Sequence, residues 1–331
     1  MRTNRQSVIV LFVILILGIA SIASAADPLP SWNEGAVKDR IMKFVDDVTN
    51  EVSDACVEPE DRIAVFDNDG TLWVEQPIYP QAIFTLEKVK ELLPKHPEWK
   101  TTQPYKGLMD GNMQEVGVFG AKGLAEMLIA TYSGTTATDF AKAVKEWISK
   151  AKHPRFKRLY TELVYQPQLE LMAYLRSKGF KIYIVSGGGR EFMRAWTEPV
   201  YGVPAEQVVG SSVVAEFWMV DDKPVIVRLP KIDFISNKAG KPIGIYQQIG
   251  RRPIFAFGNS DGDMQMIQYT KAGNGNRLAL FVHHTDAERE YAYDRKSHVG
   301  RLDKVLDMAQ ANDWIIVDMK KDWKQIFPTV E

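Results

Sequence analysis

The chain has 331 residues, of which 45% are hydrophobic and 25% are charged, and its formal net charge is −1. This length allows a large core in one elaborate domain or in two smaller ones. Because positive and negative charges balance, no basic field covers the chain, and we expect no nucleic acid among its partners.

The N-terminal residues predict a secretory signal peptide. Two arginines precede an uncharged stretch at 8–22, and the small-residue sequence Ala23-Ser24-Ala25 follows it. This order is typical of a signal that is cleaved near Ala25, so we expect residues 1–25 to be removed and the protein to be exported, either to a periplasm or outside the cell, with no membrane attachment after cleavage. The alternative is an uncleaved anchor, because the stretch is long for a signal core and short for a spanning helix.

Export implies an oxidising compartment, yet Cys56 is the only cysteine of the chain. It can form no disulfide within the chain, so stability must come from a packed core. No histidine follows it at helical spacing. We therefore expect Cys56 to be a small buried hydrophobic residue.

A helical pattern and then an apolar strand open the part of the chain that follows the signal. The helix is expected at 37–48 and the strand at Ile63–Phe66. After the strand, three further helices are expected at 83–93, 121–132 and 136–148, the last capped by Thr136 with Asp139 three residues on, and a loop is expected at 107–120. We interpret residues 77–165 as a helical cap inserted into a core of residues 26–76 and 166–331.

The second part of the core alternates strands with helices. Strands are expected at 181–185, 254–257, 278–282 and, at an edge, 314–317, helices at 166–177, 242–249 and 302–309, and a β-hairpin at 213–229. This alternation predicts an α/β fold with a parallel, doubly wound sheet, in which the cap and the hairpin are inserts.

Three of these strands end in polar, glycine-rich turns, which follow Phe66, Val185 and Phe257. In a parallel sheet those ends share one edge, where open α/β sheets bind their ligands. Asp67 and Asp69 would lie close together there, and two like charges in a confined site need a cation or a shared proton. The alternative is an Asp-rich turn without a function, since Asp, Asn and Gly are common in turns.

The turns resemble the motifs of the haloacid dehalogenase-like phosphohydrolase superfamily, and specifically its phosphoserine-phosphatase-like branch with a helical cap. Asp67-Asn68-Asp69-Gly70-Thr71 resembles the first motif and Ser186-Gly187-Gly188 the second. A lysine before the strand at 254–257 corresponds to the third motif, and Gly258-Asn259-Ser260-Asp261-Gly262-Asp263 resembles the fourth. The resemblance covers about residues 63–282 and implies the Rossmann-like core of that superfamily.

The resemblance also implies a reaction. Asp67 would be a nucleophile that forms an aspartyl-phosphate, and Asp69 a general acid and base for the leaving oxygen and the attacking water. In this superfamily a dehalogenase lacks the second Asp, because it has no leaving oxygen to protonate, so Asp69 favours phosphate over halide. The implied phosphate-binding residues are Ser186, Gly187, Lys241 and Thr71.

A metal ion belongs to the same expectation. A carboxylate about 4 Å from one negative charge of a phosphate is repelled by roughly 4 kcal/mol at an effective dielectric constant of 20. A hard divalent cation, most plausibly Mg²⁺, offsets much of this repulsion. The resemblance implies that Mg²⁺ is held by Asp67, the backbone carbonyl of Asp69, Asn259 and Asp263.

Two assignments stay open at this stage. The common fourth motif has Asp where this chain has Asn259, so Asp261 is an alternative ligand to Asn259 and Asp263. The phosphate-binding lysine is Lys241, with Lys238 as the alternative, because both precede the strand at 254–257.

Three other positions invite a functional interpretation. Glu75 follows the first motif and Arg190 follows the second, and either could contact the substrate; Arg190 could equally be a solvated residue of a first helical turn. His283 and His284 point to opposite faces if their segment is a strand, so at least one of them is expected to be structural rather than a ligand of a second metal.

The sequence thus predicts an exported, Mg²⁺-dependent phosphatase that hydrolyses a small phosphomonoester. A phosphotransferase with the same intermediate is one alternative, because nothing in the sequence separates water from another acceptor. A non-catalytic module that binds a phosphate-containing ligand is the alternative from another class. The sequence fixes neither the phosphomonoester nor the oligomeric state.

Overall fold

The computed structural model describes residues 26–110, 123, 126–127 and 129–329. The expected signal peptide at 1–25, five of the twelve residues of the helix expected at 121–132, and most of the loop expected at 107–120 lie outside the described residues. None of the described helices is long and apolar enough to span a bilayer.

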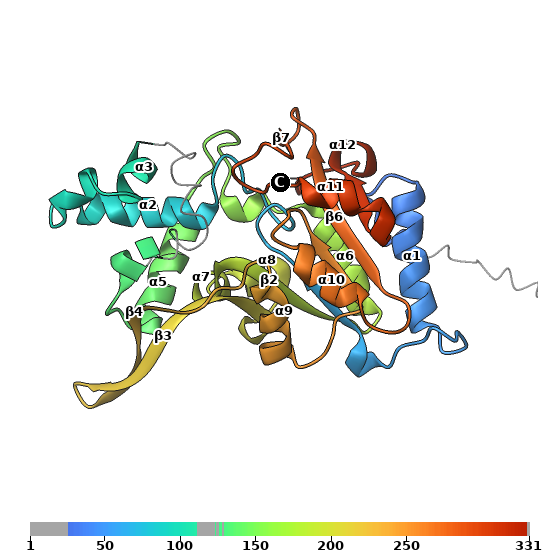
Figure 1. Ribbon diagram of the computed structural model, residues 1–331, viewed down its shortest axis with the longest axis horizontal. Coiled ribbons are helices and arrows are strands. Elements are labelled where there is room, and N and C mark those ends of the chain that lie inside the picture. Colours follow the sequence, from blue (N-terminus) through green and yellow to red (C-terminus); the bar gives the residue numbers. More distant parts are fainter. Residues whose placement is uncertain (1–25, 111–122, 124–125, 128, 330–331) are drawn as a thin grey trace, which may run out of the picture.

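An eight-stranded sheet forms the centre of the protein (Figure 1). Its order is β4-β3-β2-β1-β5-β6-β7, with β8 beside β6. The strands are β1 Ile63–Phe66, β2 Lys181–Gly189, β3 Val208–Val220, β4 Lys223–Phe234, β5 Phe255–Gly258, β6 Leu278–Thr285, β7 Ala292–Tyr293 and β8 Ile315–Asp318. All pairings are parallel except β3 with β4 and β6 with β7. This sheet confirms the predicted α/β fold.

Both faces of the sheet are covered, and β1 shows why. Its four residues are all buried, and they alternate between two hydrophobic clusters: Ala64 and Phe66 belong to one, Ile63 and Val65 to the other. This alternation follows from the two-residue period of a strand. An apolar run without polar positions therefore has to lie between two layers of helices.

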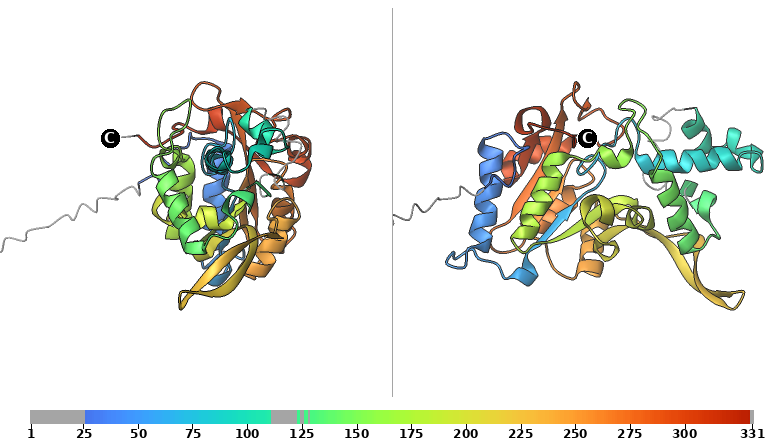
Figure 2. Two further views of the ribbon diagram at one scale, coloured as in Figure 1. Left: turned by 90° about the vertical axis from the view of Figure 1, so that its left-hand side faces the viewer. Right: turned by 180° about the vertical axis from the view of Figure 1, so that it is seen from behind.

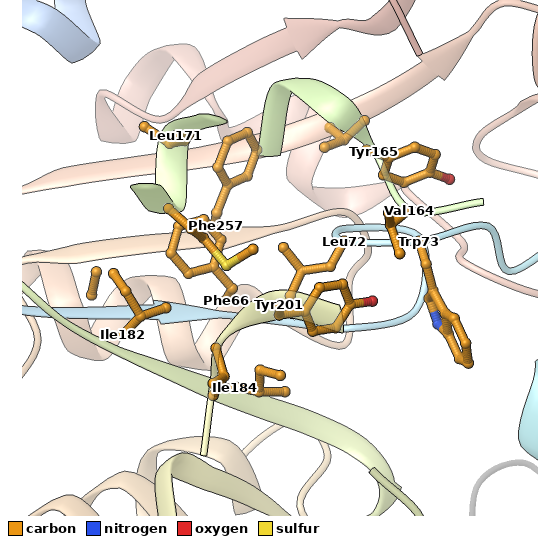
Figure 3. Packing of buried hydrophobic residues seen from close by; sticks show 14 of the residues in the cluster. Phe66, Leu72, Trp73, Val164, Tyr165, Leu171, Ile182, Ile184, Tyr201 and Phe257 are labelled. Carbon is orange, nitrogen blue, oxygen red and sulfur yellow. The ribbon is translucent and has the colours of Figure 1, made fainter. Parts of the chain in front are cut away.

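The first hydrophobic cluster lies under α1 (Ala36–Thr49) and α6 (Gln166–Ser177). Phe66 and Phe257 stack in it with ring centroids 6.1 Å apart, and Figure 3 shows Leu171 of α6 near them. The second cluster lies under α9 (Gly240–Gly244), η5 (Ile245–Ile249), α10 (Met264–Lys271) and α11 (Lys304–Met308). Shorter elements complete the core: η1 Pro59–Asp61, α7 Arg190–Arg194, α8 Thr197–Tyr201, η4 Ala205–Gln207, η6 Gln310–Asn312 and α12 Met319–Asp322.

A helical region and a β-hairpin arm extend from one side of the sheet (Figures 1 and 2). The described elements of this region are α2 Pro80–Leu92, η2 Pro97–Lys100, α3 Tyr105–Met109, α5 Ala137–Ile148 and η3 Tyr160–Glu162. Thr136 caps α5 by accepting a hydrogen bond from the backbone N–H of Asp139, at 3.0 Å, so the predicted helix start is confirmed. The domain boundaries at 77 and 165 stay a prediction.

The arm is formed by β3 and β4, which turn at Asp221-Asp222 as predicted. Both residues have positive φ, 50° and 59°, and Asp is among the residues that tolerate this conformation in a hairpin turn. The arm is longer than predicted, because β3 begins at Val208 as a core strand parallel to β2 and only later pairs with β4. The sequence pattern missed this first half, since residues 208–212 are buried without alternation.

Three other details differ from the sequence-based expectation. Cys56 is exposed, so its expected burial is wrong: it lies in the surface loop that joins α1 to η1, where no hydrophobic layer covers it. The strand predicted to end at Val185 continues to Gly189 as β2. The helix predicted at 242–249 begins at Gly240 and changes to a π-helical turn at Ile245.

Candidate active site

The carboxyl ends of β1, β2 and β5 meet at one edge of the sheet. Asp67 directly follows β1, and its backbone N–H donates to the carbonyl of Phe257 in β5, at 2.9 Å. A cavity of about 880 Å³ opens over this edge, and Asp67, Asp69, Ser186, Lys241 and Asp263 all line it. The predicted convergence of the three glycine-rich turns is therefore found in the structure.

The charges nearest to Asp67 form a buried ion-pair chain. Lys241, near the start of α9, is 2% exposed, and its Nζ lies 2.7 Å from Oδ1 of Asp67. The same ammonium forms an ion pair with Oδ1 of Asp263. One lysine thus links the turn after β1 to the turn after β5.

Burial raises the pKa of Asp67 to about 7, and the nearby carboxylate of Asp263 acts in the same direction, whereas the Lys241 ammonium opposes both. For Lys241, burial alone would lower the pKa, but attraction to Asp263 and Asp67 outweighs it and the pKa is raised. A single ammonium therefore does not compensate all the acid groups of this edge. That imbalance is the kind that a bound cation relieves.

Asp69 is held by a tryptophan four residues on. Nε1 of Trp73 donates to Oδ1 of Asp69, at 2.9 Å, and the Trp73 ring stacks on Trp196 with centroids 4.3 Å apart. Burial raises the pKa of Asp69, against the hydrogen bond from Trp73 and the charge of Lys241. A carboxyl group that keeps its proton to higher pH suits the role of a general acid.

The glycine turn of β2 forms the next part of the cavity wall. Oγ of Ser186 is buried and accepts a hydrogen bond from the N–H of Gly188, at 3.1 Å. The N–H of Gly189 donates to Oε1 of Gln81 in α2, at 2.8 Å, which ties this turn to the helical region. Ser186 and Gly187 face the cavity, as their expected role in binding phosphate requires.

Thr71 lies behind the first turn rather than on the cavity. It is fully buried, and its hydroxyl donates to Oδ1 of Asn259, at 3.2 Å. Nδ2 of Asn259 donates to Oε1 of Glu75, at 2.6 Å, and the hydroxyl of Tyr293 donates to the same oxygen, at 2.7 Å. Thr71 therefore orients the fourth turn, and the structure shows no direct path from its hydroxyl to the cavity.

Glu75 reaches the cavity wall and is 2% exposed. Burial raises its pKa well above the usual range, whereas the hydrogen bond from Tyr293 acts in the opposite direction. The Glu75 carboxyl lies beside Asn259. The common fourth motif has an Asp at the position that Asn259 occupies in this chain. The structure thus places an acid group near the position at which the chain lacks one.

The two acids of the fourth turn have different partners. Oδ2 of Asp263 accepts from the backbone N–H groups of Asn259, at 3.1 Å, and Ser260, at 3.0 Å. Both oxygens of Asp261 point elsewhere: they accept from the N–H groups of residues 303–305 at the start of α11. Because Asp261 caps that helix, its carboxylate is not free to replace Asn259 as a ligand.

Several oxygen atoms beside Asp67 fit a hard divalent cation. Among the described residues, no three His, Cys, Asp or Glu side chains are grouped to hold a metal ion, so a site here has to include amide or backbone oxygens. Oδ1 of Asp67 is buried and faces the Lys241 ammonium at 2.7 Å. With Oδ1 of Asn259 and the carbonyl of Asp69 it offers the oxygen ligands that Mg²⁺ prefers. Each of these side chains already has a partner: Asp67 pairs with Lys241, and Oδ1 of Asn259 accepts from Thr71. Asp263 is engaged through both of its oxygens.

The side chains of two remaining candidates, Arg190 and Lys238, take no part in the ion-pair chain of Asp67, Lys241 and Asp263. Arg190 begins α7 and pairs with Glu191, at 3.0 and 3.1 Å, and it is not part of the cavity wall. Lys238 lines the cavity but is exposed, whereas Lys241 is buried against Asp67. Lys231 is exposed and is not part of the cavity wall.

A buried histidine contacts the backbone of the turn after β1, and the sequence did not indicate this contact. Nε2 of His284 lies 2.8 Å from the carbonyl of Gly70, and Nδ1 lies 3.1 Å from Oε2 of Glu290. His283 faces the other side and lies 3.4 Å from Asp294. The alternation of the two histidines was predictable from the strand, but their partners are distant in sequence.

Comparisons with known proteins agree with this geometry. A model of the haloacid dehalogenase-like hydrolase family matches residues 64–268, more than half of the chain. A search of curated proteins finds no match. Among solved structures, a protein of unknown function from Anaerococcus prevotii DSM 20548 has a TM-score of 0.50 at 18% identity, with 76% of this chain and 86% of that chain covered.

Two further solved structures are less similar in their coordinates. One is a protein of unknown function from Bordetella pertussis Tohama I, with a TM-score of 0.49, 14% identity, and 78% of this chain and 98% of that chain covered. The other is a phosphoserine phosphohydrolase-like protein from Francisella tularensis, with a TM-score of 0.39, 18% identity, and 67% and 87% covered. The family match spans the turns after β1, β2 and β5. The chain belongs to the haloacid dehalogenase-like hydrolase family.

Proposed function

We propose that this protein is an exported phosphatase that hydrolyses a small phosphomonoester through an aspartyl-phosphate on Asp67, with Mg²⁺ as its cofactor. The observation that carries this proposal is the arrangement of Asp67, Asp69 and Lys241 around one cavity: a carboxylate nucleophile, a second carboxyl group two residues on, and a buried ammonium between acids. Phosphoryl transfer needs mainly positioning and charge compensation, and these groups supply both.

The reaction would take place in two steps. A carboxylate oxygen of Asp67 attacks the phosphorus, the bond from phosphorus to the ester oxygen breaks, and Asp69 donates its proton to that leaving oxygen. Water then attacks the phosphorus of the aspartyl-phosphate while Asp69 takes up a proton. Inorganic phosphate leaves, and Asp67 returns to its carboxylate form.

The other residues of the cavity position the phosphate. Lys241 would attract its oxygens, and the hydroxyl of Ser186 would donate to one of them. Asp67, the carbonyl of Asp69 and Asn259 would hold Mg²⁺, which when bound neutralises charge between the nucleophile and the phosphate. Asn259 contributes no charge to this set, so we expect weaker binding of Mg²⁺ than with an Asp there.

Release of inorganic phosphate tests the function directly. The purified protein should release phosphate from a generic aryl phosphate, and from members of a panel of phosphorylated amino acids, amino alcohols, sugars and nucleotides, in a manner that needs Mg²⁺ and stops with EDTA. Absence of release from the whole panel with Mg²⁺ present would refute the proposal. Added alcohols in the same assay report any transfer to an acceptor other than water.

Export is a separate part of the proposal. It rests on the arginines, the apolar stretch and the small-residue site at 1–25. Expression of the full chain in a bacterial host, followed by fractionation and N-terminal sequencing, should give a protein outside the cytoplasm that begins near Ala26. A cytoplasmic protein that keeps its first residues would contradict it.

A further inference from the structure

A buried arginine lies on the same cavity wall as the catalytic edge but comes from the hairpin arm. Arg228 belongs to β4, is 3% exposed and lines the cavity together with Asp67 and Lys241. The cavity thus extends from the acid groups at the sheet edge to a positive charge on the insert.

The position of Arg228 is well defined. Its backbone N–H donates to the carbonyl of Thr135, at 3.0 Å, and its carbonyl accepts from the N–H of Gly134, at 2.9 Å. The guanidinium lies over the ring of Phe140 in α5, with Cζ 3.7 Å from the ring centroid. A guanidinium stacked on a ring keeps its N–H groups in the plane free for a ligand.

The charge of Arg228 has no acid partner. Among the described residues, it forms no ion pair within 4 Å, its Nε has no hydrogen-bond partner, and Nη1 reaches only the carbonyl of Tyr132, at 3.4 Å. Glu191 lines the same cavity, but its carboxylate is paired with Arg190. Burial lowers the pKa of Arg228, against the attraction of Glu191, yet a guanidinium stays charged in proteins.

A buried, unpaired charge destabilises a protein unless it is compensated. A ligand can provide the compensation, and a guanidinium binds carboxylate and phosphate groups through two parallel hydrogen bonds. We propose that Arg228 binds a second anionic group of the substrate, a carboxylate or a second phosphate, while the scissile phosphate lies at Asp67. This inference rests on the proposed phosphatase function and narrows its substrates to phosphomonoesters with two anionic ends.

The strand geometry indicates how long such a substrate is. Oγ of Ser211 donates to the carbonyl of Gly187, at 2.8 Å, so this end of β3 lies beside the phosphate-binding turn. Arg228 is paired with Ala215, four residues further along β3. At about 3.3 Å per residue, the Cα atoms of Ser211 and Ala215 are about 13 Å apart. Arg228 therefore suits an elongated substrate better than one with only two or three carbons between its ends.

The experiment compares matched substrates. A hexose monophosphate, the corresponding phosphorylated sugar acid and the corresponding bisphosphate differ only in the end remote from the scissile phosphate. The wild-type protein should have a higher kcat/KM for the sugar acid or the bisphosphate than for the monophosphate, and the better of the two identifies the anionic group. Equal values for all three would overturn the inference.

Arg228→Met keeps an unbranched side chain against Phe140 and removes the charge. It should lower the preference for the two-ended substrate by about ten- to a hundredfold, mainly through KM. Arg252→Met is the matched control: Arg252 is also stacked on a ring, with Cζ 3.9 Å from the Tyr269 centroid, but does not line the cavity. It should leave the preference unaltered. An equal loss for all substrates in Arg228→Met would assign Arg228 to packing alone and overturn the inference.

Two further measurements keep the test decisive. If Arg228→Met does not fold, Arg228→Lys carries the test, because it keeps the charge and loses the planar pair of donors. Its preference for the two-ended substrate should fall by a smaller factor, and an unchanged preference would count against the inference.

Calorimetric binding to Asp67→Asn separates the role of Arg228 from the proposed phosphatase function. Tighter binding of the two-ended ligand, lost with Arg228→Met, supports Arg228 even if the wild-type protein hydrolyses nothing, in which case only the proposed function fails.

Discussion

The two ends of the cavity have opposite charge imbalances. At the sheet edge, Lys241 lies between Asp67 and Asp263, and the acid groups outnumber the single ammonium. At the hairpin arm, Arg228 has no acid partner within 4 Å in the described part of the chain. Under the proposed function, the first end would hold a cation and accept a phosphate, whereas the second would bind an anion. The chemistry would then lie in the core, and the inserts would select the substrate.

The largest expected effect belongs to the sheet edge. Asp67→Asn removes the proposed nucleophile, and we expect kcat to fall by at least about a thousandfold. The free energy of unfolding should not fall, because burial already disfavours the charged form of Asp67. Steady-state kinetics and denaturant unfolding of the same preparation check both statements. Asp221→Asn, in the exposed hairpin turn, is the control, and retained turnover in Asp67→Asn would move the nucleophile to another residue.

The charge balance at this edge can be disturbed next. Lys241→Met leaves Asp67 and Asp263 without their shared ammonium, and removing one partner of a buried ion pair costs roughly 3–5 kcal/mol. Urea unfolding should show this loss together with loss of activity. Lys238→Met serves as the control, because Lys238 is exposed and, in the described part of the chain, Lys241 rather than Lys238 pairs with the two acids. Equal stability of the two variants would refute the compensating role of Lys241.

A smaller effect is expected from the group that orients Asp69. Trp73→Phe keeps an aromatic ring against Trp196 and removes the N–H that donates to Asp69. Loss of one hydrogen bond to a charged group costs about 1.5–3 kcal/mol, so kcat should fall by about ten- to a hundredfold with little change in KM. Trp196→Phe keeps the hydrogen bond and should affect stability more than kcat. The reverse pattern would mean that Trp73 acts through packing alone.

The smallest expected effect concerns the pH dependence of stability. It comes from a residue that lies away from both ends of the cavity, where the helical region joins the core. His153 is fully buried, its Nε2 lies 2.7 Å from the carbonyl of Gln76, and burial lowers its pKa despite that hydrogen bond. Protonation therefore favours the unfolded chain. The full contribution is present above the unfolded pKa of about 6.5 and is lost as the pH falls from there through the folded pKa, with a slope of at most about 1.4 kcal/mol per pH unit.

Unfolding at a series of pH values measures this slope. His153→Gln should reduce it, whereas His96→Gln, whose side chain is 43% exposed in the wild-type protein, should not. An unchanged slope in His153→Gln would show that another group dominates the loss of stability in this range.

The features that local chemistry specifies were predictable from the sequence. Buried strands appear in the sequence as apolar runs, and the turn after β1 combines Asp67 and Asp69 with glycine. The fold and the convergence of the turns could therefore be predicted from the sequence. Contacts between residues distant in sequence could not be predicted. Asp261 and Asn259 look equivalent along the chain, and only the start of α11 makes Asp261 a helix cap. Arg228 looked like one residue of a hairpin strand, because its burial depends on the position of α5.

The central claim is that Asp67 carries the phosphoryl group during turnover. The most direct measurement is mass spectrometry of the protein mixed with substrate and Mg²⁺, quenched in acid and digested with pepsin at low pH. We predict the mass of one phosphoryl group on the peptide that contains residues 63–73, assigned by fragmentation to Asp67, in the wild-type protein and at higher occupancy in Asp69→Asn. A phosphoryl group on another residue, or continued turnover without any labelled protein in both preparations, would contradict the account.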